Sequence, residues 1–345
     1  MSFSVPSIDI SAYLNGGSED SKQAVAQLAD SACREVGFVQ VHGHGIGDDV
    51  IAGLAGAMDE FFADKTVDEK SEFRTPPGIN RGYAPPKSEA TSLSLGVEPA
   101  NKMNDFFEAF NIGLDRSYYP DVELPEDDYQ ENVWPSETFR EPVLRYFHAV
   151  REVASVLMDV FEDALGLPDG YFAAKSHAAT GTMRMNNYAL TPGLEVTLDG
   201  DLRGMGEHTD YGVVTLLWAD QVKGLQVLGT DGNWHDVSPD DGALLVNLGD
   251  ITARLTNDKW MSTLHRVKPP VVDGTIQRRR SVAYFHSFDW DAVVSPLPQC
   301  VDAGEEALYE PITVHDHLHA KLQGSRAGVS NTSAVRESSR VRASL

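Results

Sequence analysis

The feature that most constrains the fold of this chain is a change in sequence pattern near residue 180. From there on, short apolar runs are separated by Gly, Asn, Asp and Pro. Such runs are too short for helices, and closely spaced turn residues favour a β-sandwich or barrel. The predicted strands are 182–188, 213–218, 225–227, 243–247, 265–267 and 281–286. We therefore expect the second half of the chain to form a β-barrel-like core.

The first half of the chain has helical periodicity instead. Helices are predicted over 21–36, 51–62 and 139–165, and short strands over 5–10 and 38–41. The longest of these helices has apolar residues at helical spacing, which predicts one buried face. These residues are Val143, Tyr146, Phe147, Val150, Val153, Ala154, Leu157 and Val160.

Two N-terminal segments carry weaker signals. In the helix predicted over 21–36, Ala24, Leu28 and Ala32 share one face, which we expect to be buried. Residues 71–135 are rich in Pro, Gly, Ser and Asp and show no clear periodicity. A segment of that length is usually functional or wraps over the core.

Composition limits the classes of partner. The formal charge is −24, which argues against nucleic acid or an anionic membrane as the main partner. No apolar run reaches the roughly 18 residues of a membrane-spanning helix, and the N-terminus lacks a secretory pattern. Cys33 and Cys300 are distant from each other and do not form a disulfide framework. We expect a cytoplasmic protein that binds a small molecule, with no obligate protein partner.

One tripeptide suggests a metal site. His208-Thr209-Asp210 is the only His-x-acid sequence in the chain, and residues i and i+2 of a strand point to the same face. An imidazole and a carboxylate together with a further His make a facial triad, which suits non-haem Fe(II). His265, in an apolar-flanked run, is the best candidate for that third ligand. The alternative is that His265 is a hydrogen-bonded core residue.

Polar residues alternate within the predicted strand that contains three consecutive arginines. Arg279 and Ser281 share a face, and a guanidinium beside a hydroxyl suits a carboxylate. Arg278 and Arg280 share the other face, where a solvated basic cluster is the simpler interpretation.

The predicted strand upstream shows the same alternation. Arg184, Asn186 and Tyr188 fall on one face. Because buried polar groups need partners, this face predicts a polar ligand inside the barrel.

Taken in order, these motifs resemble the isopenicillin N synthase-like branch of the Fe(II)/2-oxoglutarate-dependent oxygenases, over roughly residues 4–322. Any one motif is weak, but the ordered set is specific. The matching N-terminal segments are 5–10, 33–38, 42–46, 61–62, Lys70 and 81–83. The matching C-terminal segments are 208–212, 224–227, 247–250, 264–267 and Arg279-x-Ser281.

The resemblance implies a mixed α+β, mainly β fold. Its core would be a distorted double-stranded β-helix, a cupin-like jelly roll, surrounded by helices. The implied organisation is an N-terminal helix-rich region over 1–175, an oxygenase jelly-roll domain over 176–322 and a polar C-terminal tail over 323–345.

The resemblance also implies residue roles. His208, Asp210 and His265 would bind Fe(II) and act as the catalytic centre. Arg279 and Ser281 would hold the distal carboxylate of 2-oxoglutarate, and the same co-substrate would be supported by Tyr188 and Asn186. One departure is the long connection of thirteen residues (266–278) before Arg279, which leaves Arg278 and Arg280 as alternatives.

The implied activity is the oxidation, most commonly the hydroxylation, of a C–H bond in a small organic metabolite. O2 and 2-oxoglutarate are consumed, and succinate and CO2 are released. Candidates for the substrate site are Arg184, Phe106, Phe107, Tyr211, Leu225, Phe285 and His286. Arg184 is a candidate partner for a substrate carboxylate, and a structural salt bridge is its alternative role. Two other functions stay open: a 2-oxoglutarate-independent non-haem iron oxidase, of the isopenicillin N synthase or ethylene-forming type, and a non-catalytic jelly-roll binding protein.

A second group of histidines lies near the end of the chain. His315, His317 and His319 follow Pro311, and on a helix His315 and His319 would be neighbours. An exposed helix start is the simpler interpretation, and a second metal site is the alternative.

Overall fold

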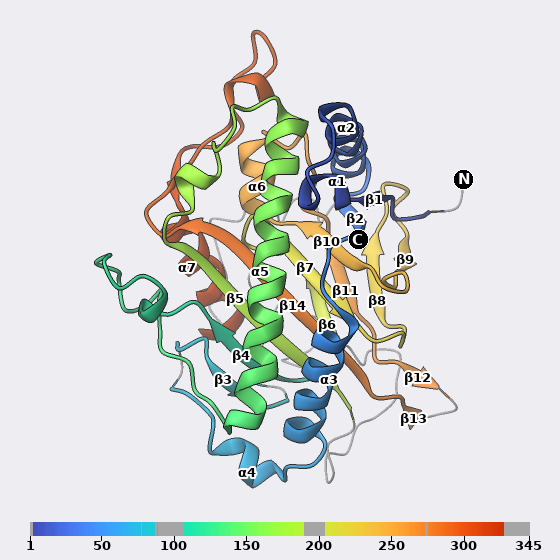
Figure 1. Cartoon of the computed structure of the whole chain (residues 1–345), viewed down its shortest axis with the longest axis vertical. Coiled ribbons are helices and arrows are strands. Elements are labelled where there is room, and N and C mark those ends of the chain that lie inside the picture. The colour runs from blue at the N-terminus through green and yellow to red at the C-terminus, as the bar shows by residue number, and fades with distance from the viewer. Residues whose placement is uncertain are drawn as a thin grey trace.

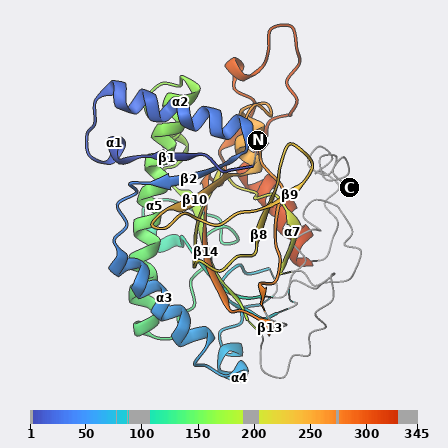
Figure 2. The same cartoon turned by 90° about the vertical axis from the view of Figure 1, so that its right-hand side faces the viewer.

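The computed structural model describes residues 3–76, 78–86, 88, 107–189, 204–272 and 275–327. Its centre is a pair of facing sheets, and helices pack along one side of the larger one (Figures 1 and 2). This arrangement is the expected mixed α+β fold with a jelly-roll core.

The larger sheet has eight strands, drawn from both halves of the chain. Their order is β1 (Ser7–Asp9), β2 (Phe38–His42), β10 (Leu244–Leu248), β7 (Val214–Ala219), β14 (Arg279–Asp289), β5 (Ala179–Tyr188), β4 (Glu108–Gly113) and β3 (Gly82–Ala84). All pairings are antiparallel except that of β1 with β2. The N-terminal half therefore supplies both edges of this sheet.

The smaller sheet has four strands, in the order β6 (Met205–His208), β11 (His265–Val267), β8 (Leu225–Leu228) and β9 (Trp234–Asp236). Two short hairpin-like pairs, β12 (Val271–Val272) with β13 (Thr275–Ile276) and β15 (Val293–Val294) with β16 (Ile312–Thr313), lie outside both sheets. All the strands predicted after residue 180 are present, which confirms the β-rich second half.

The eight-stranded sheet has two chemically different faces. The outer face packs against helices and is apolar, with Phe110, Met183, Leu216, Val246 and Val282 in one core cluster. The inner face turns toward the four-stranded sheet and mixes apolar with polar residues. Because side chains alternate along a strand, neighbouring residues of one strand serve these two different environments.

Seven α-helices lie in the described part of the chain. They are α1 (Ser11–Leu14), α2 (Glu19–Glu35), α3 (Asp48–Phe62), α4 (Val67–Ser71), α5 (Glu137–Leu165), α6 (Asp250–Leu255) and α7 (Val314–Ala327). The long helix α5 crosses the outer face in Figure 1 and buries all the apolar positions predicted for it. The Ser136 side chain accepts the Phe139 N–H at 3.0 Å to begin this helix, and Gly166 ends it in the left-handed region.

Of the face predicted for α2, only Ala32 is buried. Ala24 is exposed, and Leu28 is 56% exposed. The buried residues of α2 are Ala26, Ala29, Ala32 and Cys33. Several alanines on different sides of this helix give it little contrast in hydrophobicity, so spacing alone does not identify the face that packs.

The unassigned segment 71–135 contributes β4 and the edge strand β3. On β4, the buried Glu108 accepts hydrogen bonds from Lys70 Nζ and Tyr83 OH, both at 2.7 Å, and from Asn187 Nδ2 at 2.9 Å. This network ties the N-terminal region to β5. The domain boundaries at 175/176 and 322/323 stay predictions, and α7 continues through the second of them to Ala327.

None of the helices in the described ranges is both long enough and apolar enough to cross a bilayer. Cys33 and Cys300 are both buried as free thiols.

Candidate metal and co-substrate site

Three potential metal ligands meet on the inner side of the four-stranded sheet. His208 at the end of β6 is paired directly with His265 at the start of β11, and their ring centroids are 4.2 Å apart. Asp210 Oδ1 lies 3.8 Å from the Nε2 atom of each histidine. The three ligand atoms lie within 4.8 Å of one another, and all three residues are buried. Two imidazoles and one carboxylate form the donor set that suits non-haem Fe(II).

Second contacts fix the orientation of these side chains. His208 Nδ1 is 2.8 Å from the Gly206 carbonyl, and His265 Nδ1 is 3.0 Å from the Thr263 carbonyl. With Nδ1–H donating to a carbonyl, Nε2 keeps its lone pair for a metal. Burial lowers the pKa of His208, and the neighbouring His265 lowers it further. A neutral imidazole is the form that binds a metal.

Asp210 is held from the eight-stranded sheet. Its Oδ2 accepts a hydrogen bond from Asn247 Nδ2 at 2.7 Å, and its backbone carbonyl accepts the Asp250 N–H at 2.8 Å. The prediction that His208 and Asp210 share one strand face is wrong, because β6 ends at His208. Asp210 instead lies in the following loop and is aimed by Asn247. This role of Asn247 was not predicted from the sequence, although an Asn inside an otherwise apolar run such as 244–248 is a signal for it.

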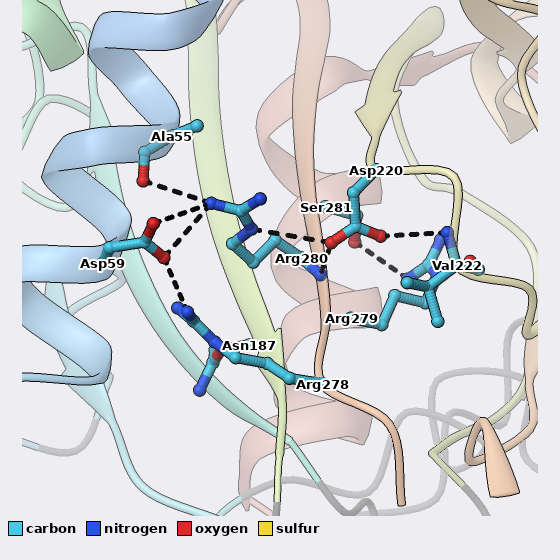
Figure 3. A network of polar contacts seen from close by, with 9 residues as sticks. All are labelled: Ala55, Asp59, Asn187, Asp220, Val222, Arg278, Arg279, Arg280 and Ser281. Atoms are coloured by element: carbon cyan, nitrogen blue, oxygen red, sulfur yellow. Dashed lines mark hydrogen bonds and ion pairs between the residues drawn. The ribbon is translucent and has the colours of Figure 1, made fainter. Parts of the chain in front are cut away.

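A buried guanidinium lies on the inner face of the eight-stranded sheet. Arg279 is 2% exposed, and its Nε donates to the Val222 carbonyl at 3.2 Å while Nη1 donates to Ser281 Oγ at 3.1 Å (Figure 3). Its guanidinium carbon is 5.2 Å from the centre of the Tyr188 ring. Among the described residues, no carboxylate forms an ion pair with Arg279. Because a buried charge is costly without a counter-ion, this site fits an anionic ligand such as the distal carboxylate of 2-oxoglutarate.

The flanking arginines lie on the outer face. Arg278 and Arg280 both form ion pairs with Asp59 of α3, at 2.6 and 3.0 Å, and Arg280 also contacts Asp220 (Figure 3). Both are partly buried. The prediction of a solvated basic cluster is therefore wrong for this pair, because the packing of α3 against the sheet supplies carboxylates that the local sequence does not contain.

Other predicted site residues line the same inner face. Asn186 is paired with Ser281, and Tyr188 with Arg279, across β5 and β14. Arg184 Nε donates to Asn186 Oδ1 at 3.1 Å, and its guanidinium lies 4.9 Å from the centre of the Phe107 ring. The charge of Arg184 also contributes, as the smallest of the causes, to the lowered pKa of His208.

Some of the remaining substrate-site candidates lie between the two sheets, and others lie on the outer face or beside α7. Phe107 and Leu225 belong to the apolar cluster between the sheets, and Phe285 shares the face of Ser281. His286 points to the outer face, where its ring is 6.5 Å from that of Tyr284. Tyr211 lies beside α7, and Phe106 lies outside the described residues. The structure thus brings Phe107, Leu225 and Phe285 toward the site and leaves His286 away from it.

A buried ionic network supports the loop that carries Asp210. Asp250 is 2.7 Å from Lys321 Nζ of α7 and accepts hydrogen bonds from Ser262 Oγ at 2.7 Å and Thr209 Oγ1 at 3.2 Å. The nearby Lys321 helps to hold the pKa of Asp250 below its usual range against the effect of burial. Sequence reasoning missed this network because Asp250 and Lys321 are distant in sequence and neither has a motif of its own.

Comparisons with known proteins agree with this arrangement. A family model described as "non-haem dioxygenase in morphine synthesis N-terminal" matches residues 5–137. A second, described as "2OG-Fe(II) oxygenase superfamily", matches residues 180–287 and so includes the three ligands, Arg279 and Ser281.

Individual relatives match almost the whole chain. The 2-oxoglutarate-Fe(II) type oxidoreductase hxnY of Emericella nidulans is 35% identical over 93% of this chain and 90% of its own length. Validamycin A dioxygenase of Streptomyces hygroscopicus subsp. limoneus is 30% identical over 88% of this chain and 82% of its own. A full-length Neurospora crassa protein, solved as a crystal structure in complex with alpha-KG, superposes with a TM-score of 0.78 at 28% identity, covering 92% of this chain and 95% of that one.

Proposed function

The chain belongs to the 2-oxoglutarate- and Fe(II)-dependent oxygenase superfamily, and we propose that its substrate is a small metabolite whose anionic group is bound by Arg184. As an enzyme of this type it uses Fe(II), 2-oxoglutarate and O2, and it releases succinate and CO2. The alternatives of a 2-oxoglutarate-independent oxidase and of a non-catalytic binding protein are therefore set aside.

We assign Fe(II) to His208, Asp210 and His265. When bound there, the iron supplies the activation of O2 that oxidises a substrate C–H bond. The chain's own contribution is to favour the neutral form of His208, to fix both imidazoles through their Nδ1 contacts and to aim Asp210 through Asn247. The donor set and its burial support this assignment.

We assign the distal carboxylate of 2-oxoglutarate to Arg279 and Ser281. Arg279 provides charge-assisted donors, and the Ser281 hydroxyl holds the guanidinium in place. Tyr188 packs over the guanidinium, and Asn186 lies directly opposite Ser281. These contacts orient the co-substrate in a region from which water is largely excluded.

The observation that carries the substrate proposal is the position of Arg184. It is a cation on the inner face, where it lies opposite Ala283 and donates a hydrogen bond to Asn186, the residue paired with Ser281. Phe107, beneath its guanidinium, offers an aromatic surface for the apolar part of a substrate. The Neurospora crassa relative has been crystallised with thymine and with 5-formyluracil, each together with alpha-KG. This supports a substrate of similar size for this chain.

The test is a screen for succinate formation with small carboxylic acids and their matching primary amides. We expect the unmodified enzyme to prefer an acid, and Arg184→Gln to lose this preference by raising KM for the acid alone. Arg278→Gln is the matched control, because it removes a guanidinium from the outer face. Equal kcat/KM for acid and amide in the unmodified enzyme would exclude the role of Arg184. No succinate with any of these acids or amides would instead contradict the proposed substrate class.

A further inference from the structure

A second group of metal-type ligands, two of them on α7, lies away from the inner face. His315 Nδ1 is 2.8 Å from Asp128 Oδ2, and His319 Nε2 is 3.1 Å from Asp128 Oδ1. The two imidazole rings are one helical turn apart, with centroids separated by 4.0 Å. The three ligand atoms lie within 4.8 Å of one another. The Asp128 side chain is 6% exposed, whereas those of His315 and His319 are about one third exposed.

We propose that Asp128, His315 and His319 form a second metal site, for a divalent transition ion such as Zn²⁺. Imidazole nitrogens select Zn²⁺, Co²⁺, Ni²⁺ and Cu²⁺, whereas Mg²⁺ and Ca²⁺ prefer sites made of oxygen alone. Three protein ligands leave a further position for water. The partial exposure of both imidazoles gives the ion a path from solvent.

The surrounding charge favours a cation. Asp127 and Asp316 are close enough to add to the raised pKa of His319, which is caused first by its hydrogen bond to Asp128. The carboxylates of Asp128, Asp127 and Asp316 therefore all act on His319. The backbone N–H of His315 donates to the Trp290 carbonyl at 2.8 Å, and the Trp290 ring packs edge-on against His315. This contact fixes the start of α7 and limits the movement of one ligand.

Metal binding there would replace two hydrogen bonds by three coordinate bonds. The imidazole protons that now point at Asp128 would move to the opposite ring nitrogens, and any second proton on His319 would pass to water. No bond between heavy atoms breaks. Because the ligands must lose their protons, affinity should fall as the pH drops below neutrality.

The position of α7 links this second metal site to the first one. In Figure 2 α7 lies on the opposite side of the strands from α5. A different face of the same helix carries His317, 3.0 Å from the Tyr211 carbonyl, and Lys321, 2.7 Å from Asp250. An ion at Asp128 would therefore join the 126–129 turn to the helix that supports the loop of Asp210.

The experiment measures Zn²⁺ bound per metal-free full-length chain by equilibrium dialysis and elemental analysis at neutral pH. The variant His315→Gln/His319→Gln should bind one Zn²⁺ fewer than the unmodified chain, and Asp128→Asn should bind the second ion more weakly. His177→Gln, which changes a single exposed histidine elsewhere, should bind the same amount as the unmodified chain. Circular dichroism checks that each variant is folded.

A variant without the iron ligands separates the two sites. His208→Ala/His265→Ala should still bind one Zn²⁺, and that ion should be lost when His315→Gln/His319→Gln is added. The proposal is overturned if His315→Gln/His319→Gln binds as much Zn²⁺ as the unmodified chain. It is also overturned if His208→Ala/His265→Ala binds none. If His208→Ala/His265→Ala binds as much Zn²⁺ as the unmodified chain, the iron assignment fails and the second site stands.

Discussion

Replacement of Arg279 by Gln tests the co-substrate site most directly. The guanidinium is 2% exposed, and within the described residues it has only neutral hydrogen-bond partners. A 2-oxoglutarate carboxylate bound there becomes a buried anion that depends on this cation. Removing one partner of a buried ion pair costs about 3–5 kcal/mol. At about 1.4 kcal/mol per tenfold change, the KM for 2-oxoglutarate should rise roughly 150- to 4,000-fold.

Arg280→Gln is the matched control on the same strand. Arg280 points to the outer face and pairs with Asp59, which is 45% exposed, so solvent screens much of the interaction. We expect a loss of at most about 1 kcal/mol in the free energy of unfolding. The KM for 2-oxoglutarate should not change, because the inner face is intact.

The assay is succinate formation at saturating Fe(II) and substrate over a range of 2-oxoglutarate concentrations. Anaerobic Fe(II) binding, measured in parallel, should be the same in Arg279→Gln and in the unmodified enzyme. An increase in KM below about tenfold would refute the assignment of Arg279 as the carboxylate anchor. A similar increase in Arg280→Gln would show instead that the strand as a whole had been disturbed.

Three further predictions concern residues that support the site and a buried histidine of the outer face. Asn247→Ala removes the 2.7 Å hydrogen bond to Asp210 and should weaken Fe(II) binding about 10- to 100-fold in an anaerobic titration; unchanged affinity would exclude the positioning role. Lys321→Met leaves Asp250 as an unpaired buried charge and should lower the free energy of unfolding in urea by about 3–5 kcal/mol, with partial recovery when Asp250→Asn is added; a loss below about 1 kcal/mol would contradict this. Burial lowers the pKa of His286 to about 4. Between pH 6.5 and 4 the folded protein therefore binds fewer protons at this residue than the unfolded chain does. The free energy of unfolding should fall by up to about 1.4 kcal/mol for each pH unit as the pH is lowered through this range. His286→Phe should reduce this slope in urea titrations at several pH values, and an unchanged slope would be evidence against a neutral buried His286.

Sequence patterns predicted helices and strands well where the two faces of the element differ in polarity. The strand from Arg279 to Asp289 alternates between two environments, so the inner position of Arg279 with Ser281 followed from spacing alone. The strand β4 was missed because all of its residues are buried and no alternation is visible. The face of α2 was misjudged because a run of alanines gives little contrast.

The contacts that complete each site depend on residues distant in sequence. His208 and Asp210 were chosen from a strand periodicity that does not apply, and Asn247 gives Asp210 its position instead. The partner of His315 and His319 is Asp128, which precedes them by 187 and 191 residues. Local patterns supply the residue types at each site, whereas the sheet order decides which of them meet.

The three consecutive arginines of β14 have a consequence for strand alignment. A slip of one residue against β5 and β7 would carry Arg279 to the helix side and bring both Arg278 and Arg280 to the inner side. The ion pairs of Arg278 and Arg280 with Asp59 and Asp220 would then be lost. These outward ion pairs therefore stabilise the observed register of β14. In the observed register one guanidinium, that of Arg279, faces the proposed site of the 2-oxoglutarate carboxylate, whereas the slipped register would place two guanidinium groups there.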